Sequence, residues 1–271
     1  MIRARNAPIA FCLALLTLCL QDSTSQTTKI RPDLAKYFEK ANVRGSFSLY
    51  DIKNDRYILT DSNQFTQGFT PASTFKICNS LIGLETGVIA DENFVITWDG
   101  VKRQREEWNR DQDLKTAYKN STVPYYQELA RRVGGARMKQ WLDKAGYGNA
   151  DTSGGIDLFW LRGGLRISPA QQLNFLKRLY REDLPFSKRS MAITKKIMIE
   201  EENASYTLRS KTGWGDQDGM NIGWYVGYVT TTDNAYFFAT CLQTPTPDDN
   251  FATNRKSITR KILAELYILP Q

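Results

Sequence analysis

Strand-like segments lie near both ends of this chain, with a long helical region between them. The runs GSFSLYDI (45–52) and RYILT (56–60) alternate in polarity around a short turn, which predicts a β-hairpin. Three more strand-like runs follow residue 200: SYTLRSKTG, NIGWYVGYVTT and NAYFFATCLQT, the last two joined by a turn at Asp233-Asn234. The two groups stand near opposite ends of the chain, and strands of one domain bury their apolar faces together. We therefore expect both chain ends to meet in one antiparallel sheet.

The middle of the chain, residues 70–200, has helical periodicity. Ser168-Pro169 followed by Gln171 is typical of a helix start, and Gly87 and Gly146 are typical of helix ends. The segments with this pattern are TFKICNSLIGLETG, NSTVPYYQELARRVG, ARMKQWLDKAG and SPAQQLNFLKRLYRE.

The sequence therefore predicts an α+β fold with helices from both chain ends flanking the sheet. A final amphipathic helix is expected at about residues 254–269. One catalytic domain, 26–271, is divided into a sheet lobe (26–69 and 201–271) and a helical lobe (70–200). We expect the functional site between the lobes, where ligand pockets commonly form.

The first 25 residues have the pattern of a signal peptide. Arg3 and Arg5 precede an apolar run of signal-peptide length, and small polar residues follow it. We predict cleavage near Ser25 and export to the periplasm, and the run is too short for a membrane span. Lipidation at Cys19 is a less favoured alternative, because Leu18 is large where a lipoprotein signal has a small residue.

Cleavage would leave two cysteines, Cys78 and Cys241. A disulfide between them is one alternative in an oxidising compartment, but each lies in an apolar context, so two separate buried thiols are favoured. The formal charge is +7, with basic residues spread among acidic ones, so nucleic acid is not an expected partner. The sequence leaves monomer and homodimer open.

The chain contains no histidine. This excludes Ser-His-Asp and Cys-His catalytic arrangements, and it disfavours a zinc hydrolase site, so no metal is expected. A hydrolase of this composition needs a base made from a lysine or a carboxylate.

Ser73 and Lys76 stand three positions apart in the apolar stretch PASTFKICNSL. Pro71 and the pattern after it place Ser73 at a helix N-terminus, where a developing anion is stabilised, and Lys76 on the same helix face. On this motif alone, a capping serine beside a lysine that extends to water is the favoured reading.

Two other short motifs favour a catalytic over a structural role for Ser73 and Lys76. KTG, 211–213, ends a strand-like run. At an exposed sheet edge it can present a cation and backbone N–H groups to a substrate. The structural alternative is a lysine that only protects the edge from pairing with another chain. STV, 121–123, opens a helix, and a simple helix cap is its structural alternative. All three motifs in this order, in an exported chain without histidine, indicate a catalytic site.

The combined motifs resemble those of class D serine β-lactamases, across nearly all of the mature chain. S-x-x-K and K-T-G are shared by serine β-lactamases and penicillin-binding proteins. S-T-V, YGN (147–149), FWL (159–161) and WDG (98–100) make the resemblance specific to class D. It implies hydrolysis of penicillin-type β-lactams, and hence antibiotic resistance, in the β-lactamase/transpeptidase-like fold.

The resemblance also implies residue roles. Ser73 would be the acylated nucleophile, and Lys76 would react with carbon dioxide to form a carbamate (N6-carboxylysine), the general base. No other cofactor is implied. Trp160 would donate its indole N–H to the carbamate, and Val123 and Leu161 would shield it from water.

The remaining implied roles concern the substrate. Ser121 would relay a proton to the leaving nitrogen, with Lys211 nearby, and the N–H groups of Ser73 and Trp214 would form the oxyanion hole. The substrate carboxylate would bind at Lys211, Thr212, Gly213 and Arg255. Arg255 is identified by its place in ATNRKSIT, and a surface helix charge is the alternative.

Three other functions remain possible on these motifs: a β-lactam sensor domain, a peptidoglycan transpeptidase and a simple binding module. A sensor domain would follow transmembrane helices, S-T-V and FWL disfavour a transpeptidase, and a binding module needs no buried lysine. The preferred β-lactam should depend on the loops at 98–105 and 215–221.

Overall fold

The computed structural model describes Met1 and residues 26–270. The predicted signal peptide and its cleavage site, with the alternative at Cys19, therefore lie outside the described residues. No helix in the described part of the chain is both long and apolar enough to cross a bilayer.

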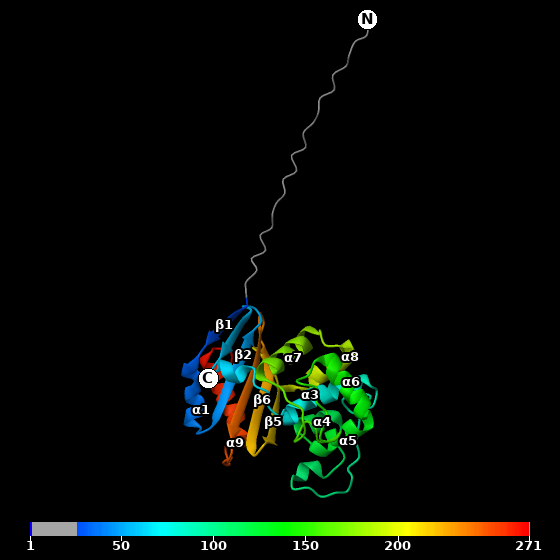
Figure 1. Ribbon diagram of the computed structural model, residues 1–271. Helices are drawn as coiled ribbons and strands as arrows, with labels where there is room; N and C mark the ends of the chain where they lie inside the picture. The colour runs from blue at the N-terminus through cyan, green and yellow to red at the C-terminus, as the bar shows by residue number, and fades with distance from the viewer. Residues whose placement is uncertain (2–25, 271) are drawn as a thin grey trace.

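A single sheet of seven strands forms the centre of the molecule (Figure 1). Strands from both chain ends meet in it, since β2 pairs antiparallel with β7. This confirms the predicted α+β fold class. The sheet order is β1-β3-β2-β7-β6-β5-β4. The strands are β1 (Thr27–Ile30), β2 (Arg44–Asp51), β3 (Arg56–Leu59), β4 (Ile199–Glu202), β5 (Thr207–Gln217), β6 (Met220–Thr230) and β7 (Ala235–Thr244).

One edge of the sheet departs from the predicted antiparallel pattern. β1, which the sequence did not predict, pairs parallel with β3, whereas the other neighbouring strands are antiparallel. β1 has the sequence TTKI and is exposed along its length, so it has no buried face to give an alternating pattern.

Helices come from both chain ends and from the middle of the chain. α1 (Lys36–Lys40) and α9 (Phe251–Glu265) come from the chain ends, and α9 begins three residues before the prediction. The short η1 (Pro32–Ala35), η2 (Ala72–Phe75) and η3 (Glu106–Trp108) are 3₁₀ turns. The other helices are α2 (Ser62–Phe65), α3 (Lys76–Glu85), α4 (Leu114–Lys119), α5 (Val123–Val133), α6 (Gly135–Ala145), α7 (Pro169–Arg181) and α8 (Lys188–Ile197).

The helices cover both faces of the sheet (Figure 1). α1 and α9 contact β2, β6 and β7 on one face, and α7 lies against the same three strands with the other middle helices beside it. Alternate residues of β7 enter two different cores: Phe237 and Cys241 pack with the middle helices, and Phe238 and Leu242 pack with α9. The sheet thus separates two hydrophobic layers.

Several local predictions are confirmed. Ser168 and Gln171 form a capping box at the start of α7. Gly146 ends α6 in the left-handed conformation, with φ +62°. Cys78 and Cys241 are separate buried thiols.

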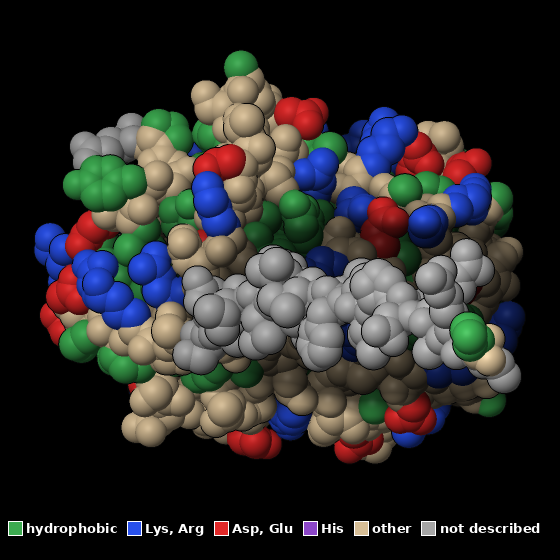
Figure 2. All heavy atoms as spheres, turned by 90° about the horizontal axis from the view of Figure 1, so that it is seen from above, with side chains coloured by type: hydrophobic (Ala, Val, Ile, Leu, Met, Phe, Trp, Pro, Cys, Tyr) green, Lys and Arg blue, Asp and Glu red, His purple; other side chains and the backbone are tan. Residues whose placement is uncertain are grey.

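One prediction about a loop was wrong. The glycine-rich segment after KTG is not a loop, because β5 continues to Gln217 and turns tightly into β6 through Asp218 and Gly219, both with positive φ. On the face seen in Figure 2, Lys and Arg side chains are interspersed with Asp and Glu rather than gathered in a stripe.

Candidate active site

Ser73 lies in the 3₁₀ turn η2, immediately before α3, and is 8% exposed. Its side chain caps neither η2 nor α3, so the reading of Ser73 as a helix cap is wrong. Ala72 has φ +47°, and its N–H donates to the Trp160 carbonyl over 2.9 Å. The FWL segment therefore holds the turn in a backbone conformation that non-glycine residues rarely adopt.

Lys76, the first residue of α3, is completely buried. Its Nζ donates to Ser73 Oγ over 2.7 Å and lies 5.2 Å from the centre of the Tyr126 ring. The lysine therefore does not extend to water. Burial lowers the pKa of Lys76 well below its usual value, and the positive charges of Lys211 and Arg105 lower it further. This environment favours the neutral amine, the form that acts as a base or a nucleophile.

Trp160 is fully buried beside this turn. Its ring lies 5.3 Å from that of Phe75, the residue before Lys76. The indole Nε1 finds no hydrogen-bond partner among the residues that the structure describes. A buried N–H without an acceptor is unfavourable by about 1–3 kcal/mol, so this donor has the chemistry to receive an added anionic oxygen.

A contact between Ser121 and Lys211 links the middle helices to the sheet. Lys211 Nζ donates to Ser121 Oγ and to the Thr212 carbonyl, both over 3.1 Å. Ser121 joins α4 to α5 with φ +53°. Its hydroxyl does not cap α5, since Thr122 holds the N-cap position.

Lys211 is buried, at 5% exposed, and this corrects the expectation of an exposed edge lysine. The Tyr118 ring covers it at 5.6 Å, and the Tyr118 hydroxyl donates to the Ser210 carbonyl. Burial lowers the pKa of Lys211 to about 7, with further lowering by the positive charges of Arg255 and Lys256.

Strand β5 passes closely over the η2 turn at Gly213. A Cβ placed there would lie 2.9 Å from the Pro71 carbonyl oxygen and 3.3 Å from the Thr74 nitrogen. Glycine is required because the two backbones touch. Trp214, the next residue of the strand, follows directly after this contact.

Arg255 extends from α9 to β5. Its Nη1 donates to the Gly213 carbonyl over 2.6 Å, and its Nε donates to Ala252 within α9. The guanidinium carbon lies 5.9 Å from the Trp214 ring centre. Burial lowers the pKa of Arg255 to about 10, with a further contribution from the charge of Arg105. The alternative of a free surface charge does not fit these contacts.

The structure thus gathers most of the predicted residues around one point, which we call the Ser73 cluster. Thr212 continues β5 between Lys211 and Gly213 and is half-buried. Val123 opens α5, and Leu161 follows Trp160, both half-buried. The members of the cluster are Ser73, Lys76, Ser121, Trp160, Lys211, Thr212, Gly213, Trp214 and Arg255.

The sequence analysis missed the residues that position this cluster. Gln172 Nε2, in α7, donates to Thr74 Oγ1 over 2.9 Å, and Thr74 Oγ1 donates to the Pro71 carbonyl. Trp224 Nε1 donates to the Thr70 carbonyl over 2.9 Å. The only sequence signal for Gln172 was a polar residue on the buried face of an amphipathic helix.

A cavity of about 270 Å³ adjoins the cluster without including it. It is lined by Trp98, Trp108, Gln112 and Thr122, but not by Ser73, Lys76 or Lys211. In the described part of the chain, no three His, Cys, Asp or Glu side chains converge as a metal site would require.

Comparison with known proteins places this geometry in context. Residues 38–264 match the model of the penicillin binding protein transpeptidase domain. Beta-lactamase OXA-48 of Klebsiella pneumoniae is 43% identical over 234 residues, which cover 86% of this chain and 88% of that protein. The probable beta-lactamase YbxI of Bacillus subtilis is 46% identical over 219 residues, covering 81% and 79% respectively.

Solved structures show the same similarity. The class D beta-lactamase YbXI from Nostoc aligns with a TM-score of 0.85 at 42% identity, over 89% of this chain and 100% of that one. A class D beta-lactamase from Sebaldella termitidis aligns with a TM-score of 0.86 at 38% identity, over 90% and 98%.

Proposed function

This chain belongs to the class D serine β-lactamases, and from that premise we propose that it hydrolyses penicillin-type antibiotics through an acyl-enzyme on Ser73. Hydrolysis of the β-lactam ring gives antibiotic resistance. The observation that carries the proposed mechanism is the 2.7 Å bond between Ser73 Oγ and the buried Lys76 Nζ.

In acylation, the base at Lys76 takes the proton of Ser73 Oγ, and this oxygen attacks the lactam carbonyl carbon. The backbone N–H groups of Ser73 and Trp214 stabilise the resulting oxyanion. The carbon–nitrogen bond of the ring then breaks, and the nitrogen receives a proton through Ser121. The 3.1 Å bond between Ser121 and the buried Lys211 supports this relay. Water then attacks the ester carbonyl, releases the opened product and restores the serine hydroxyl.

Lys76 would act as its carbamate, formed when its neutral amine adds to carbon dioxide and loses a proton. The carbamate supplies a general base for both acylation and deacylation. The complete burial of Lys76 and its lowered pKa favour the neutral amine that this addition requires. Trp160 Nε1, a buried donor without an acceptor among the described residues, would hold the added carboxylate. Val123 and Leu161 would limit the access of water.

The substrate carboxylate would bind at the other end of the cluster. Lys211, Thr212 and Arg255 meet there beside Gly213. Two cations with a hydroxyl are a suitable site for a carboxylate, because charge-assisted bonds to it are stronger than neutral ones.

Export completes the proposal: residues 1–25 would direct the chain to the periplasm and be removed, leaving a single catalytic domain, 26–271. N-terminal sequencing of exported protein should begin near Gln26. A lipid-modified Cys19 would contradict the soluble periplasmic form without affecting the chemistry.

Mass spectrometry with a slowly hydrolysed penicillin tests the central step. The adduct should lie on the peptide containing Ser73 and should be absent from Ser73→Ala. Ser80→Ala removes a buried serine from the helix that follows, α3, one that bonds to the Lys76 carbonyl and to Tyr126, and should keep the adduct. Repeated turnover distinguishes a β-lactamase from a sensor or transpeptidase, which would stop after one acylation. Penicillin hydrolysis by Ser73→Ala at the parent rate would refute the assignment.

A further inference from the structure

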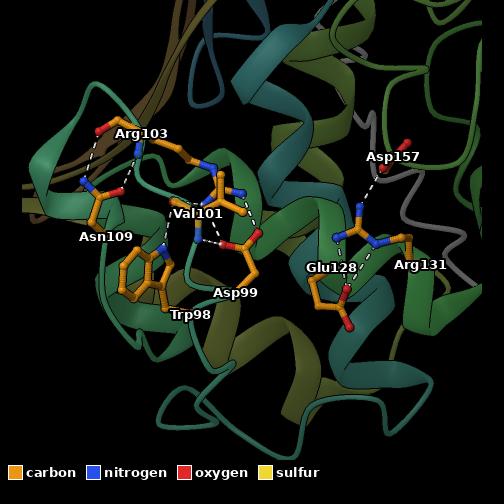
Figure 3. A network of polar contacts seen from close by, with 8 residues as sticks. All are labelled: Trp98, Asp99, Val101, Arg103, Asn109, Glu128, Arg131 and Asp157. Carbon is orange, nitrogen blue, oxygen red and sulfur yellow. Dashed lines mark hydrogen bonds and ion pairs between the residues drawn. The ribbon is translucent and has the colours of Figure 1, made fainter.

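The loop at residues 98–109 is closed by its own hydrogen bonds (Figure 3). Arg103 donates twice to the Asp99 carboxylate, over 2.8 and 2.6 Å. Asn109 accepts from the Arg103 N–H over 2.8 Å and donates to the Arg103 carbonyl over 3.0 Å. Trp98 Nε1 donates to the Val101 carbonyl. The segment between Arg103 and Asn109 is therefore fixed at both ends, and the charge of Arg103 is neutralised by Asp99.

Arg105 lies in this fixed segment, and Trp108 connects it to the Ser73 cluster. Its guanidinium carbon is 5.2 Å from the centre of the Trp108 ring, and Trp108 Nε1 donates to the Asn120 carbonyl over 3.2 Å. Asn120 immediately precedes Ser121, whose hydroxyl accepts from Lys211. A continuous series of contacts thus runs from Arg105 to the serine that would serve the leaving nitrogen.

Most of the charge of Arg105 remains available to a ligand. Its carboxylate neighbour, Glu107, is 3.7 Å away, and the two side chains are 57% and 40% exposed. An ion pair this long and this exposed contributes little. The charge of Arg105 also adds to the lowering of the pKa of Arg255, where burial is the larger cause. For the pKa values of Lys76 and Lys211 it is the smallest cause, behind burial and nearer cations.

The position of Arg105 indicates which part of a β-lactam it meets. The lactam carbonyl carbon is bonded on one side to the carbon that bears the acylamino side chain and on the other to the ring nitrogen. The nitrogen side faces Ser121 and Lys211, and it continues into the second ring, which carries the carboxylate. A substituent beside that carboxylate therefore extends toward Arg105.

We propose that Arg105 is a specificity residue that selects β-lactams by the charge of the substituent on the second ring. Cationic substituents are disfavoured relative to neutral ones, and anionic substituents are favoured. This inference rests on the proposed function of the Ser73 cluster and names a substrate class for it. The effect is that of an exposed charge pair, about 1.5- to 5-fold in rate, and it decreases as salt screens the charges.

Two cephalosporins provide a matched pair of substrates. Cephalothin and cephaloridine have the same thienylacetamido side chain, but the ring substituent of the first is a neutral acetoxymethyl group and that of the second is a pyridinium cation. The quantity to measure is the kcat/KM ratio of cephaloridine to cephalothin in each variant. Where turnover is slow, competition with a fluorescent penicillin gives the acylation rate constants. The intrinsic reactivities of the two compounds cancel when variants are compared.

Arg105→Gln should raise this ratio about 1.5- to 5-fold, and Arg105→Glu should raise it further. Glu107→Gln, which removes the opposing charge, should lower the ratio. Lys102→Gln removes the same charge from an exposed position in the same loop and should leave the ratio unchanged. The difference in this kcat/KM ratio between the parent enzyme and Arg105→Gln should become smaller at high ionic strength.

An unchanged ratio in Arg105→Gln, or an equal rise in Lys102→Gln, would overturn the inference while penicillin hydrolysis still supports the proposed function. Failure of both cephalosporins to acylate an enzyme that hydrolyses penicillin would also overturn it, because no ring substituent would then reach Arg105. Loss of penicillin hydrolysis in the parent enzyme would instead refute the proposed function.

Discussion

Arg255 donates a 2.6 Å hydrogen bond from Nη1 to the carbonyl of Gly213, linking the last helix to the strand that carries Lys211 and Thr212. The guanidinium is thus fixed at the end of the cluster where a substrate carboxylate would bind. Because the bonds to the Gly213 and Ala252 carbonyls use two N–H groups, the other guanidinium donors and the positive charge remain for the carboxylate.

Replacement of Arg255 by alanine should lower kcat/KM for penicillins by roughly ten- to a hundredfold, since a charge-assisted bond is worth about 1.5–3 kcal/mol. Steady-state kinetics with a penicillin and its carboxylate ester measures this. The substitution should lower kcat/KM much less for the ester than for the free acid. Arg255→Lys, which keeps the charge, should recover part of the rate. An equal loss for acid and ester would mean that Arg255 acts only by holding β5.

Gly213→Ala should separate β5 from the η2 turn, because the added methyl would lie 2.9 Å from the Pro71 carbonyl oxygen. The N–H of Trp214 then moves away from that of Ser73, and kcat should fall about tenfold or more. Gly135→Ala is the control, since its Cβ would meet nothing within 4 Å. If Gly213→Ala lowers thermal stability but leaves kcat at the parent value, the two N–H groups do not form the oxyanion hole.

The parts of the fold with a buried face could be predicted from sequence, and the others could not. Alternation in polarity identified β2 and β3. Runs rich in β-forming residues identified β6 and β7, and β7 is buried on both faces through residues such as Phe237 and Phe238. β1 has no buried residue and is defined only by its pairing with β3. The glycines of β5 suggested a loop, but at Gly213 they mark a close backbone contact within a strand.

The same distinction applies to the site. Ser73 and Lys76 are neighbours on one helical turn, so their spacing predicts the contact. Gln172 and Thr74 are 98 residues apart, and no local pattern connects them. Lys211 was expected to be exposed because its strand lies near the sheet edge, but Tyr118 of α4 covers it. Sequence spacing predicts local contacts, whereas the burial of a residue by a helix distant in sequence depends on the tertiary fold.

Lys211→Met should change the pH dependence of stability. Burial holds the pKa of Lys211 at about 7 in the folded protein, against 10.5 for an unperturbed lysine. Between these values the unfolded chain binds a proton that the folded protein does not, so this lysine makes stability rise with pH across that window. Below pH 7 both states are protonated and its contribution is constant.

The free energy of unfolding of Lys211→Met, relative to the parent, should therefore be greatest below about pH 7 and should decrease toward about pH 10. Urea unfolding at several pH values measures this difference. Lys102→Met, at an exposed position, serves as the control. A difference between Lys211→Met and parent that is flat over the window would show that burial does not lower the pKa of Lys211.

Bicarbonate should control the activity of this enzyme, because a carbamate on Lys76 forms reversibly. Degassed, mildly acidic buffer should remove it, lower deacylation by roughly a hundredfold or more and let the acyl-enzyme accumulate. Added bicarbonate should restore the rate, and isotope-labelled bicarbonate should give a carbamate resonance in the parent enzyme. Lys76→Ala should show neither the resonance nor the recovery.

Trp160→Phe tests how the carbamate is held, since it keeps the packing on Phe75 but removes the Nε1 donor that lacks an acceptor among the described residues. This variant should need more bicarbonate than the parent to reach the same fraction of its maximal rate. Trp141→Phe, whose ring stacks on Phe186 away from the cluster, should need no more than the parent. Full turnover by decarboxylated enzyme, without a bicarbonate response at any pH, would exclude the carbamate and require another base within the Ser73 cluster.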